Sequence, residues 1–506
     1  MPELNEQLGT VVSTMEGPSP SRVDFVVNNG KAHKGMFVEL EYSEGTMICM
    51  VEELVKTNRY FERPDSVKAI GPELEKNFPI ADWEFLLGKA KPLGVFQNNR
   101  VLRSTFPPSP GTKVFIAKKE HIKKFLGLEE KGLDIGEIQF HEIPLKLNLS
   151  KLLQKHLAVL AMSGAGKSYF ISVLIEEILS RTKEQGQIAL VVFDTHGEYT
   201  CFGESAKEGF MDFSSKTRIV DANKIKIALS NVSPTLIFSL ASSLTPVQKR
   251  EFVKIISKLK SEMKSGVGPF DLNSVRAEAA ELEPKTSASI ISAVDELEQL
   301  NLFSKVDSPS IFDLVVPGHL VAIDLNGIIS DKKKQLIVAY FSNKLFNARR
   351  QKKIAPFALL LEEAHNFIPE STAADHALAR STLRTIAREG RKFGSALIVV
   401  SQRPKRLDTT TLANCNTNII LRITNPYDLD HIKQSSEGLD AGSINMISSL
   451  RVGEALVVGE AVSAPTFFKV RLRKSQPSRH ETTLEESAKR FQLDVIKKDE
   501  ETNAFL

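Results

Sequence analysis

One eight-residue segment limits the possible folds of this chain more than any other feature. Residues 161–168 read AMSGAGKS, and they stand between an apolar run at residues 157–160 and an apolar periodic stretch at residues 169–179. A strand, a glycine-containing loop and a helix in that order surround a phosphate with backbone N–H groups and the positive end of the helix dipole. The segment therefore predicts a phosphate-binding loop, with alanine where this pattern usually begins with glycine.

The side chains of this loop have distinct predicted roles in binding ATP. Lys167 is expected to reach the β- and γ-phosphates, and the Ser168 hydroxyl is expected to bind Mg²⁺. The alternative, a glycine-rich turn with a surface lysine, does not account for the flanking strand and helix. The residues expected to contact the nucleotide here are Ser163, Gly164, Ala165, Gly166, Lys167, Ser168 and Tyr169.

Two carboxylates follow another apolar run, residues 357–361. At the carboxyl end of a strand, one acidic group can hold Mg²⁺ while a neighbour polarises the water that attacks the γ-phosphate. We assign Glu362 to the metal and Glu363 to the catalytic base, although aspartate is commoner at the first position. The alternative is that both are solvated acids that cap the next helix.

Residues 188–194 form a third apolar run, which ends in Asp194 and leads to His196 and Glu198. Because the carboxyl ends of strands in open α/β sheets line the ligand crevice, these three polar residues are expected near the nucleotide or a bound polymer. The alternative is structural, with the side chains only holding their own loop.

A fourth apolar run, residues 396–401, ends in Gln402. Its amide could hydrogen-bond the γ-phosphate or the attacking water and so act as a γ-phosphate sensor. The alternative is that Gln402 only caps a turn.

Arginines recur every three or four residues between the second and fourth of these runs, at positions 380, 384, 388 and 391. This spacing places them on one face of a helix, where Glu389 is the only acid among them. Such a face attracts anions, and the candidates are a nucleotide held by a neighbouring subunit or a DNA backbone. The alternative is an ordinary solvated face.

Composition excludes several other classes of protein. The three cysteines of the 506 residues are far apart, so a zinc site or a disulfide framework is not expected. No run of 18 apolar residues occurs, so we expect a cytoplasmic enzyme without a membrane-spanning segment. The net charge of +4 is a weak indication of nucleic-acid binding.

The apolar runs divide the chain into parts of different character. Short alternating runs with Gly and Asn turns predict a β-barrel or sandwich near the N-terminus, with a short helix at 118–126. Strands alternating with helical stretches then predict a doubly wound, mostly parallel sheet, with strands at 157–161, 188–194, 320–325, 357–361, 396–401, 418–423 and 454–458. The predicted parts are a β-barrel domain at 1–145, an α/β ATPase domain at 146–474 with a helical insertion at about 245–304, and a C-terminal tail at 475–506 with a helix near 483–491.

Four stretches resemble the HerA branch of the HerA/FtsK superfamily of DNA-pumping ATPases. They are HLAVLAMSGAGKS at 156–168, FDTHGEY at 193–199, EEAH at 362–365, and IAREGRKFGSALIVVSQRPKRLDTTTLANCNTNIILRI at 386–423. The similarity covers most of residues 156–470, and the run from 388 to 404 is its most specific part. The N-terminal β-rich part resembles the barrel (HAS-barrel) domain of that family.

The resemblance implies a RecA-like core in a homohexameric ring, with nucleotides between subunits and double-stranded DNA in the central channel. By position, Lys167 and Ser168 become the Walker A pair, and Glu363 the catalytic glutamate. Gln402 becomes the polar sensor, and Arg391 an arginine finger that acts on the neighbouring subunit. Lys155 stands where some relatives carry an arginine directed at the nucleotide, and a lysine cannot form the same bidentate contact.

The function implied is that of an ATP- and Mg²⁺-dependent DNA translocase and helicase. A nuclease partner such as NurA would join it in DNA end resection during double-strand-break repair. One alternative is a ring scaffold that activates an effector nuclease in antiphage defence, with ATP as a regulatory ligand. Another is a conjugation or secretion motor, which usually has membrane segments or membrane-bound partners.

Overall fold

The computed structural model describes residues 7–14, 17–28, 30–58, 61, 68, 84–97, 100–240, 244–371, 377–436, 438–439, 441–478, 485, 488–489 and 491–492. The chain forms two compact units that do not follow its linear order. The first unit comprises residues 1–152, 160–166 and 416–471, and the second comprises residues 153–159, 167–415 and 472–506. The boundaries predicted from the sequence, at about 145 and 474, stay a prediction.

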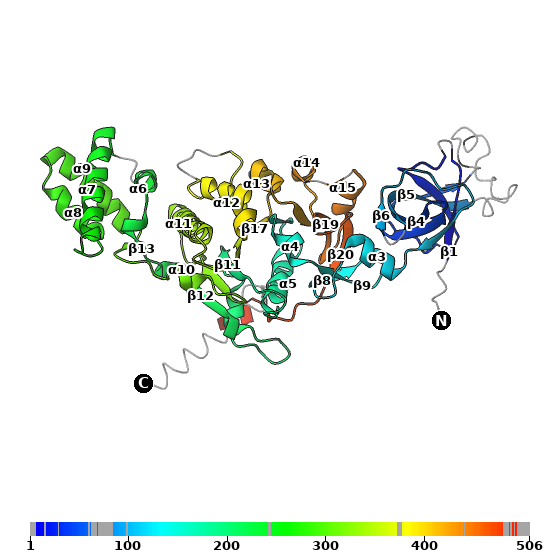
Figure 1. Ribbon diagram of the computed structural model, residues 1–506, viewed down its shortest axis with the longest axis horizontal. Helices are drawn as coiled ribbons and strands as arrows, with labels where there is room; N and C mark the ends of the chain where they lie inside the picture. The colour runs from blue at the N-terminus through cyan, green and yellow to red at the C-terminus, as the bar shows by residue number, and fades with distance from the viewer. Residues whose placement is uncertain are drawn as a thin grey trace. The chain divides into compact units, whose positions relative to one another are not determined.

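The N-terminal strands of the first unit close into a barrel (Figure 1). The strands are β1 (Gln7–Val11), β2 (Val23–Val27), β3 (Phe37–Tyr42), β4 (Gly45–Asn58), β5 (Glu84–Gln97), β6 (Arg100–Leu102) and β7 (Lys113–Ile116). They pair in the order β2-β1-β7-β3-β4-β5-β6, and a further pairing of β2 with β5 joins six of them into a ring. The predicted N-terminal β-barrel is confirmed.

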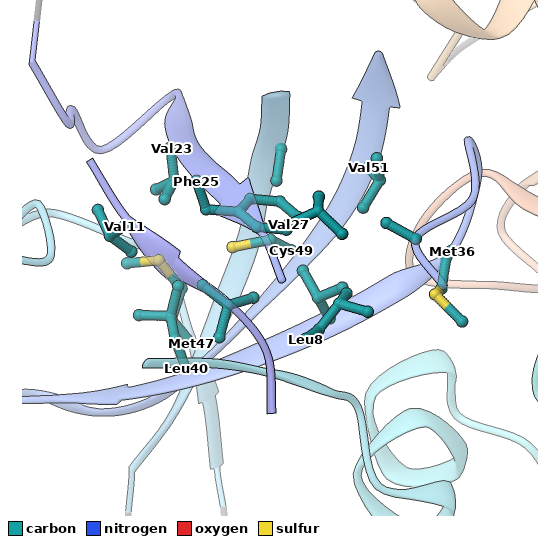
Figure 2. Close-up of a cluster of buried hydrophobic side chains, with 14 of the residues drawn as sticks. Leu8, Val11, Val23, Phe25, Val27, Met36, Leu40, Met47, Cys49 and Val51 are labelled. Atoms are coloured by element: carbon teal, nitrogen blue, oxygen red, sulfur yellow. The ribbon is translucent and has the colours of Figure 1, made fainter. Parts of the chain in front are cut away.

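Side chains from alternate positions of these strands fill the barrel interior. Figure 2 shows Leu8, Phe25, Leu40 and Cys49 converging on it, and each is at most 1% exposed. Gly88 of β5 is needed for this packing, because a Cβ there would lie 2.6 Å from the ring of Phe25. The barrel core therefore has no room for a side chain at Gly88 while Phe25 keeps its position.

The other strands of the first unit are antiparallel. β8 (Leu133–Ile138), β9 (Ile143–Leu147), β18 (Thr417–Leu421), β19 (Glu454–Gly459) and β20 (Thr466–Val470) lie in the order β18-β19-β20-β8-β9. The predicted strands at 418–423 and 454–458 are present. The assignment of residues 454–458 to the parallel part of the sheet was wrong, because β19 pairs antiparallel with β18. Only six residues join β19 to β20, too few for a parallel crossover. The helices described in this unit include α3 (Lys119–Leu126), α14 (Pro426–Ser435) and α15 (Ala441–Ile447).

The second unit contains the parallel strands. β12 (Thr217–Asp221), β15 (Leu320–Asp324), β11 (Ala189–Asp194), β16 (Phe357–Leu361), β17 (Ser395–Ser401) and β10 (Leu157–Leu160) lie side by side in that order. The four pairings from β12 to β17 are parallel. The predicted parallel core is confirmed. The edge strand β12 was not predicted, because three of its five side chains are exposed and its sequence lacks an apolar run.

Helices connect these strands and form a separate bundle within the second unit. α5 (Lys167–Leu179), α10 (Ile311–Leu314), α11 (Asp331–Arg350), α12 (Arg380–Phe393) and α13 (Thr409–Ala413) belong to the core, and a short α4 (Leu149–Leu153) precedes β10. α7 (Pro246–Lys264), α8 (Leu272–Ala280) and α9 (Pro284–Gln299) follow α6 (Pro234–Leu240) and pack on one another (Figure 1). Between the short paired strands β13 (Ile227–Ala228) and β14 (Phe303–Ser304), they form the predicted helical insertion.

The chain beyond β20 runs along helix α5. The buried carboxylate of Glu176 accepts hydrogen bonds from the backbone N–H groups of Lys474 (2.8 Å) and Ser475 (2.7 Å). The helix predicted near 483–491 falls mostly outside the described residues. Among the described helices, none combines the length and apolarity needed to cross a membrane.

Candidate active site

The predicted phosphate-binding loop lies between β10 and α5. Gly164 (φ +76°) and Gly166 (φ +95°) both adopt left-handed backbone conformations, which explains why glycine stands at these two positions. The loop is anchored at Met162, whose N–H donates to the carbonyl of Arg422 at 2.9 Å. Ser163 and Gly164 are exposed, Ala165 is buried, and helix α5 begins at Lys167. These conformations are compatible with the predicted phosphate-binding role, which stays a prediction.

Lys167 forms an ion pair with Glu363, the second residue after β16. The two side chains are 12% and 4% exposed, so the pair is largely shielded from water. Glu363 has a φ of +47°, a left-handed conformation that is rare for a residue with a side chain. Such strained backbone is typical of positions where a side chain must be held in one direction.

The second oxygen of Glu363 lies close to His365, which was not among the predicted site residues. Glu363 Oε2 is buried without a hydrogen-bond partner among the described residues, and Nδ1 of His365 lies 3.3 Å from it. The same nitrogen is 3.1 Å from the Ser401 hydroxyl at the end of β17. Burial lowers the pKa of His365, and Glu363 opposes this effect. The EEAH motif contains this histidine. Its contact with Ser401 could not be predicted, because it depends on the pairing of β16 with β17.

Glu362 links β16 to the loop that follows β11. Its Oε2 accepts hydrogen bonds from the N–H groups of Thr195 (2.9 Å) and His196 (3.2 Å), while its Oε1 is buried without a partner among the described residues. Burial raises the pKa of Glu362 well above its usual range, with Glu198 and Asp194 adding to the effect and Lys167 opposing it.

Asp194 contacts mainly its own loop, whereas His196 and Glu198 also interact with Glu362. The Asp194 carboxylate accepts from the N–H groups of Glu198 (3.0 Å) and Tyr199 (2.8 Å), which closes the loop after β11. His196 is exposed, and Glu198 retains one buried oxygen without a partner among the described residues. The geometry favours the alternative in which Asp194 holds its own loop, beside the site but not directed into it.

Gln402 lies at the same edge of the sheet as Glu363. The parallel register that pairs Leu361 with Val399 carries the ends of β16 and β17 to one side. Gln402 is half-buried and makes no side-chain hydrogen bond with any residue that the structure describes. Its amide is therefore free to bind a ligand.

Two of the four arginines on helix α12 have partners within the chain, which corrects the expectation that the whole face serves a ligand. Arg384 Nε donates to Oδ1 of Asp408 at 2.9 Å, and Nη2 of Arg380 lies 3.3 Å from the same oxygen. Asp408 is fully buried and would be an unpaired charge without them. Arg380 and Arg384 therefore stabilise the fold.

Arg388 and Arg391 are exposed and have no ion pair within the described residues. Helix α12 follows β16 and ends just before β17 begins, so Arg391 lies near the amino ends of the parallel strands. Lys155 precedes β10 and lies toward the same amino edge. Neither residue is brought together with Lys167, which follows the carboxyl end of β10.

The donors near Lys167 fit a hard divalent cation. Such a cation binds carboxylate and hydroxyl oxygens, and both Glu362 and Glu363 keep one buried oxygen without a partner among the described residues. The Ser168 hydroxyl follows Lys167 at the start of α5. The oxygen chemistry of Ser168 and Glu362 agrees with the predicted Mg²⁺ site.

Comparison with known proteins identifies relatives for both units. Residues 133–345 match the family described as "Helicase HerA, central domain". The chain is 29% identical over 485 residues to the DNA double-strand break repair helicase HerA of Saccharolobus solfataricus, covering 91% of this chain and 92% of that protein. It is also 29% identical over 462 residues to a probable helicase of Methanocaldococcus jannaschii, covering 86% of each.

A solved structure shows the same fold. VirB4 of Thermoanaerobacter pseudethanolicus superimposes with a TM-score of 0.51 at 15% identity, over 68% of this chain and 97% of that one. At this identity the likeness concerns the fold alone.

Proposed function

We propose that this chain, which is similar to the HerA helicases, moves along double-stranded DNA as a homohexameric ring driven by ATP. It is an ATP-hydrolysing enzyme of the helicase and translocase class. The curated HerA relatives from Saccharolobus solfataricus and Pyrococcus furiosus are named DNA double-strand break repair helicases. We extend this role to the present chain, with a nuclease of the NurA kind as partner in DNA end resection.

The observation that carries the proposal is the contact between Lys167 and Glu363. A cation that binds the γ-phosphate and a carboxylate that can accept a proton from water lie at one point, at the end of the phosphate loop. The γ-phosphate can replace Glu363 as the anion beside Lys167. Glu363 is then free to orient the attacking water and take its proton as the bond between the γ-phosphorus and ADP breaks.

Two further groups complete this hydrolysis site in the proposal. Gln402, with its free amide, would contact the γ-phosphate or the attacking water. Mg²⁺ held by Ser168 and Glu362 would neutralise charge on the phosphate oxygens when bound.

The position of Arg391 supports action between subunits. It is exposed at the edge of the sheet away from Lys167, so it cannot serve the nucleotide of its own chain without large rearrangement. In a closed ring with identical head-to-tail contacts, the same arginine can face the nucleotide of the next subunit. Arg391 would then stabilise the charge that develops in the transition state. Lys155, near the same edge, would belong to this seam in the proposal.

Replacing the proposed base tests the function. ATP-dependent displacement of a third strand from a triplex on blunt duplex DNA reports translocation without requiring strand separation. We expect Glu363→Gln to bind ATP and assemble as the wild type does, but to displace the third strand at least 100-fold more slowly. The matched control is Glu281→Gln, which removes an exposed carboxylate from the helical insertion and should behave as the wild type.

Two outcomes would contradict the proposal. Displacement by Glu363→Gln at the wild-type rate would remove Glu363 from catalysis. Full activation of a bound nuclease by a ring that cannot hydrolyse ATP would indicate a scaffold and not a motor.

A further inference from the structure

A cavity of about 370 Å³ opens near the carboxyl ends of β11 and β16 in the second unit. The loop after β11, the first turns of helix α11 and the short 3₁₀ turn after β16 form its walls. Neither Lys167 nor Glu363 is among the lining residues. The lining residues that concern its chemistry are Thr195, Asp331, Lys332, Lys334, Gln335 and Asn366.

The cavity has an excess of positive charge. Lys332 is exposed and Lys334 is half-buried, and neither ammonium group has an acidic partner within the part of the chain that the structure describes. Asp331 is the one carboxylate among the described lining residues. Two unpaired lysines against one aspartate favour an anionic ligand.

The polar part of the lining is held in place by hydrogen bonds. The Gln335 amide nitrogen donates to the carbonyl of Asn366 at 2.5 Å, and its oxygen accepts from the N–H of Ala379 at 3.4 Å. Gln335 is 7% exposed. Gln335 therefore joins three segments of the chain, and these hydrogen bonds fix the shape of the site that a ligand would enter.

Two lining residues, Thr195 and Asn366, form hydrogen bonds with Glu362 and Glu363. The Thr195 N–H and hydroxyl donate to the side chain (2.9 Å) and to the carbonyl (3.2 Å) of Glu362. The N–H of Asn366 donates to the carbonyl of Glu363 at 2.8 Å. A displacement of either wall would therefore move Glu362 and Glu363.

We propose that this cavity binds a backbone phosphate of duplex DNA through Lys332 and Lys334, and that its occupancy accelerates ATP hydrolysis through Thr195 and Asn366. The inference rests on the proposed function and deepens it by naming a contact for the DNA and a route to the site. The loop that enters α11 projects into solvent, with Ile329 99% exposed, so a large polymer can reach the lysines. Contact through a phosphate carries no base information, so binding here is independent of sequence.

The test removes both charges in the double variant Lys332→Ala/Lys334→Ala. Each phosphate contact contributes about 0.9 to the slope of log affinity against log salt concentration, so we expect this slope to fall by about 1 for blunt duplex DNA. The ratio of ATP hydrolysis with and without saturating duplex should fall about tenfold. The charge-preserving variant Lys332→Arg/Lys334→Arg should retain the salt slope and the stimulation.

The matched control removes two exposed lysines from the helical insertion, in Lys264→Ala/Lys285→Ala. It should keep both the salt slope and the stimulation of the wild type. A loss of equal size in this control would show a general charge effect and would overturn the proposal.

Inorganic phosphate distinguishes the two sources of the ligand. If inorganic phosphate inhibits the wild type but not the Lys332→Ala/Lys334→Ala variant, while the DNA parameters of that variant stay unchanged, the cavity holds free phosphate and the DNA proposal is wrong. An unaltered salt slope with unaltered stimulation in the variant would also overturn it. If the proposed function itself is wrong, duplex DNA will not stimulate ATP hydrolysis by the wild type. This result distinguishes failure of the proposed function from failure of the cavity proposal.

Thr195→Val tests the route to the catalytic residues. The substitution keeps the shape of the side chain and removes its hydrogen bond to the Glu362 carbonyl. We expect the salt slope of DNA binding to be retained while stimulation falls at least threefold. Full stimulation in this variant would overturn the coupling through Thr195.

Discussion

The ammonium group of Lys167 is paired with the carboxylate of Glu363, although 196 positions separate the two residues in the sequence. The pair joins the start of helix α5 to the end of strand β16, both at the carboxyl edge of the parallel strands. Each residue thus balances the charge of the other. In the proposed function the γ-phosphate replaces this carboxylate beside Lys167, so the strength of the pair bears on nucleotide binding.

A double-mutant cycle measures this exchange. For Lys167→Ala, Glu363→Gln and the double variant, we expect a coupling free energy of about 2 kcal/mol in nucleotide-free protein, because the pair is shielded from water. The measurement is the free energy of unfolding by urea titration. Additive effects of the two substitutions, within about 0.5 kcal/mol, would show that the pair does not form in solution.

The local parts of the site could be predicted from the sequence. Consecutive residues around Lys167 form the strand, the loop and the helix, so their order can be predicted locally. The apolar run before Glu362 and Glu363 predicts the end of a strand in the same way. Parallel strands carry their ends to one edge, so the proximity of both segments follows from the fold class. The roles of the individual site residues stay predictions.

Pairing direction and distant partners could not be predicted in the same way. The runs that form β18 and β19 are apolar like those of the parallel strands. Neither run therefore indicates that these two strands pair antiparallel. Asp408 lies 24 positions from Arg384, and nothing in its neighbourhood indicates a buried carboxylate. The regular spacing of the arginines on helix α12 therefore gave no indication that two of them pair with Asp408.

Arg391 is predicted to act on the nucleotide of a neighbouring subunit. Arg391→Ala alone should reduce ATP hydrolysis about 1,000-fold, since arginine fingers contribute on that order. When Arg391→Ala protein is mixed with inactive Lys167→Ala protein, seams that combine a wild-type arginine with a wild-type lysine form, and hydrolysis should recover in part. The measurement is steady-state phosphate release across mixing ratios.

Lys392→Ala is the control for this experiment, because Lys392 is an exposed cation in the same turn of helix α12. It should hydrolyse ATP at close to the wild-type rate. No recovery at any mixing ratio, in mixtures that assemble normally, would place the action of Arg391 within its own chain.

Asp408 is predicted to be a stability residue. Burial raises its pKa, but Arg384 and the N–H and hydroxyl of Thr411 outweigh this effect and hold the pKa below its usual value. Asp408→Asn should cost about 3 kcal/mol at pH 7, because it leaves two guanidinium groups without their anion. The exposed Asp430→Asn should change stability by less than about 0.5 kcal/mol.

The pH dependence of this effect has a defined sign. A carboxyl group whose pKa is lowered on folding stabilises the native state above its unfolded pKa, and this contribution is lost as the pH falls through the folded value. The stability difference between wild type and Asp408→Asn, from urea titrations, should therefore shrink below about pH 4. A difference that grows on acidification would contradict the assignment.

His156 is predicted to make the protein less stable in mild acid. Its ring is 2% exposed, Nδ1 accepts the N–H of Leu397 at 2.9 Å, and burial lowers its pKa to about 4. Between the unfolded pKa of about 6.5 and this value, only the unfolded chain takes up the proton, so acidification favours unfolding by up to about 1.4 kcal/mol per pH unit. His156→Asn keeps an acceptor and suits the left-handed backbone at this position (φ +65°), but it does not titrate. Its melting temperature should therefore fall less than that of the wild type between pH 7.5 and 5, and parallel declines in the two proteins would show that His156 is not held neutral by its surroundings.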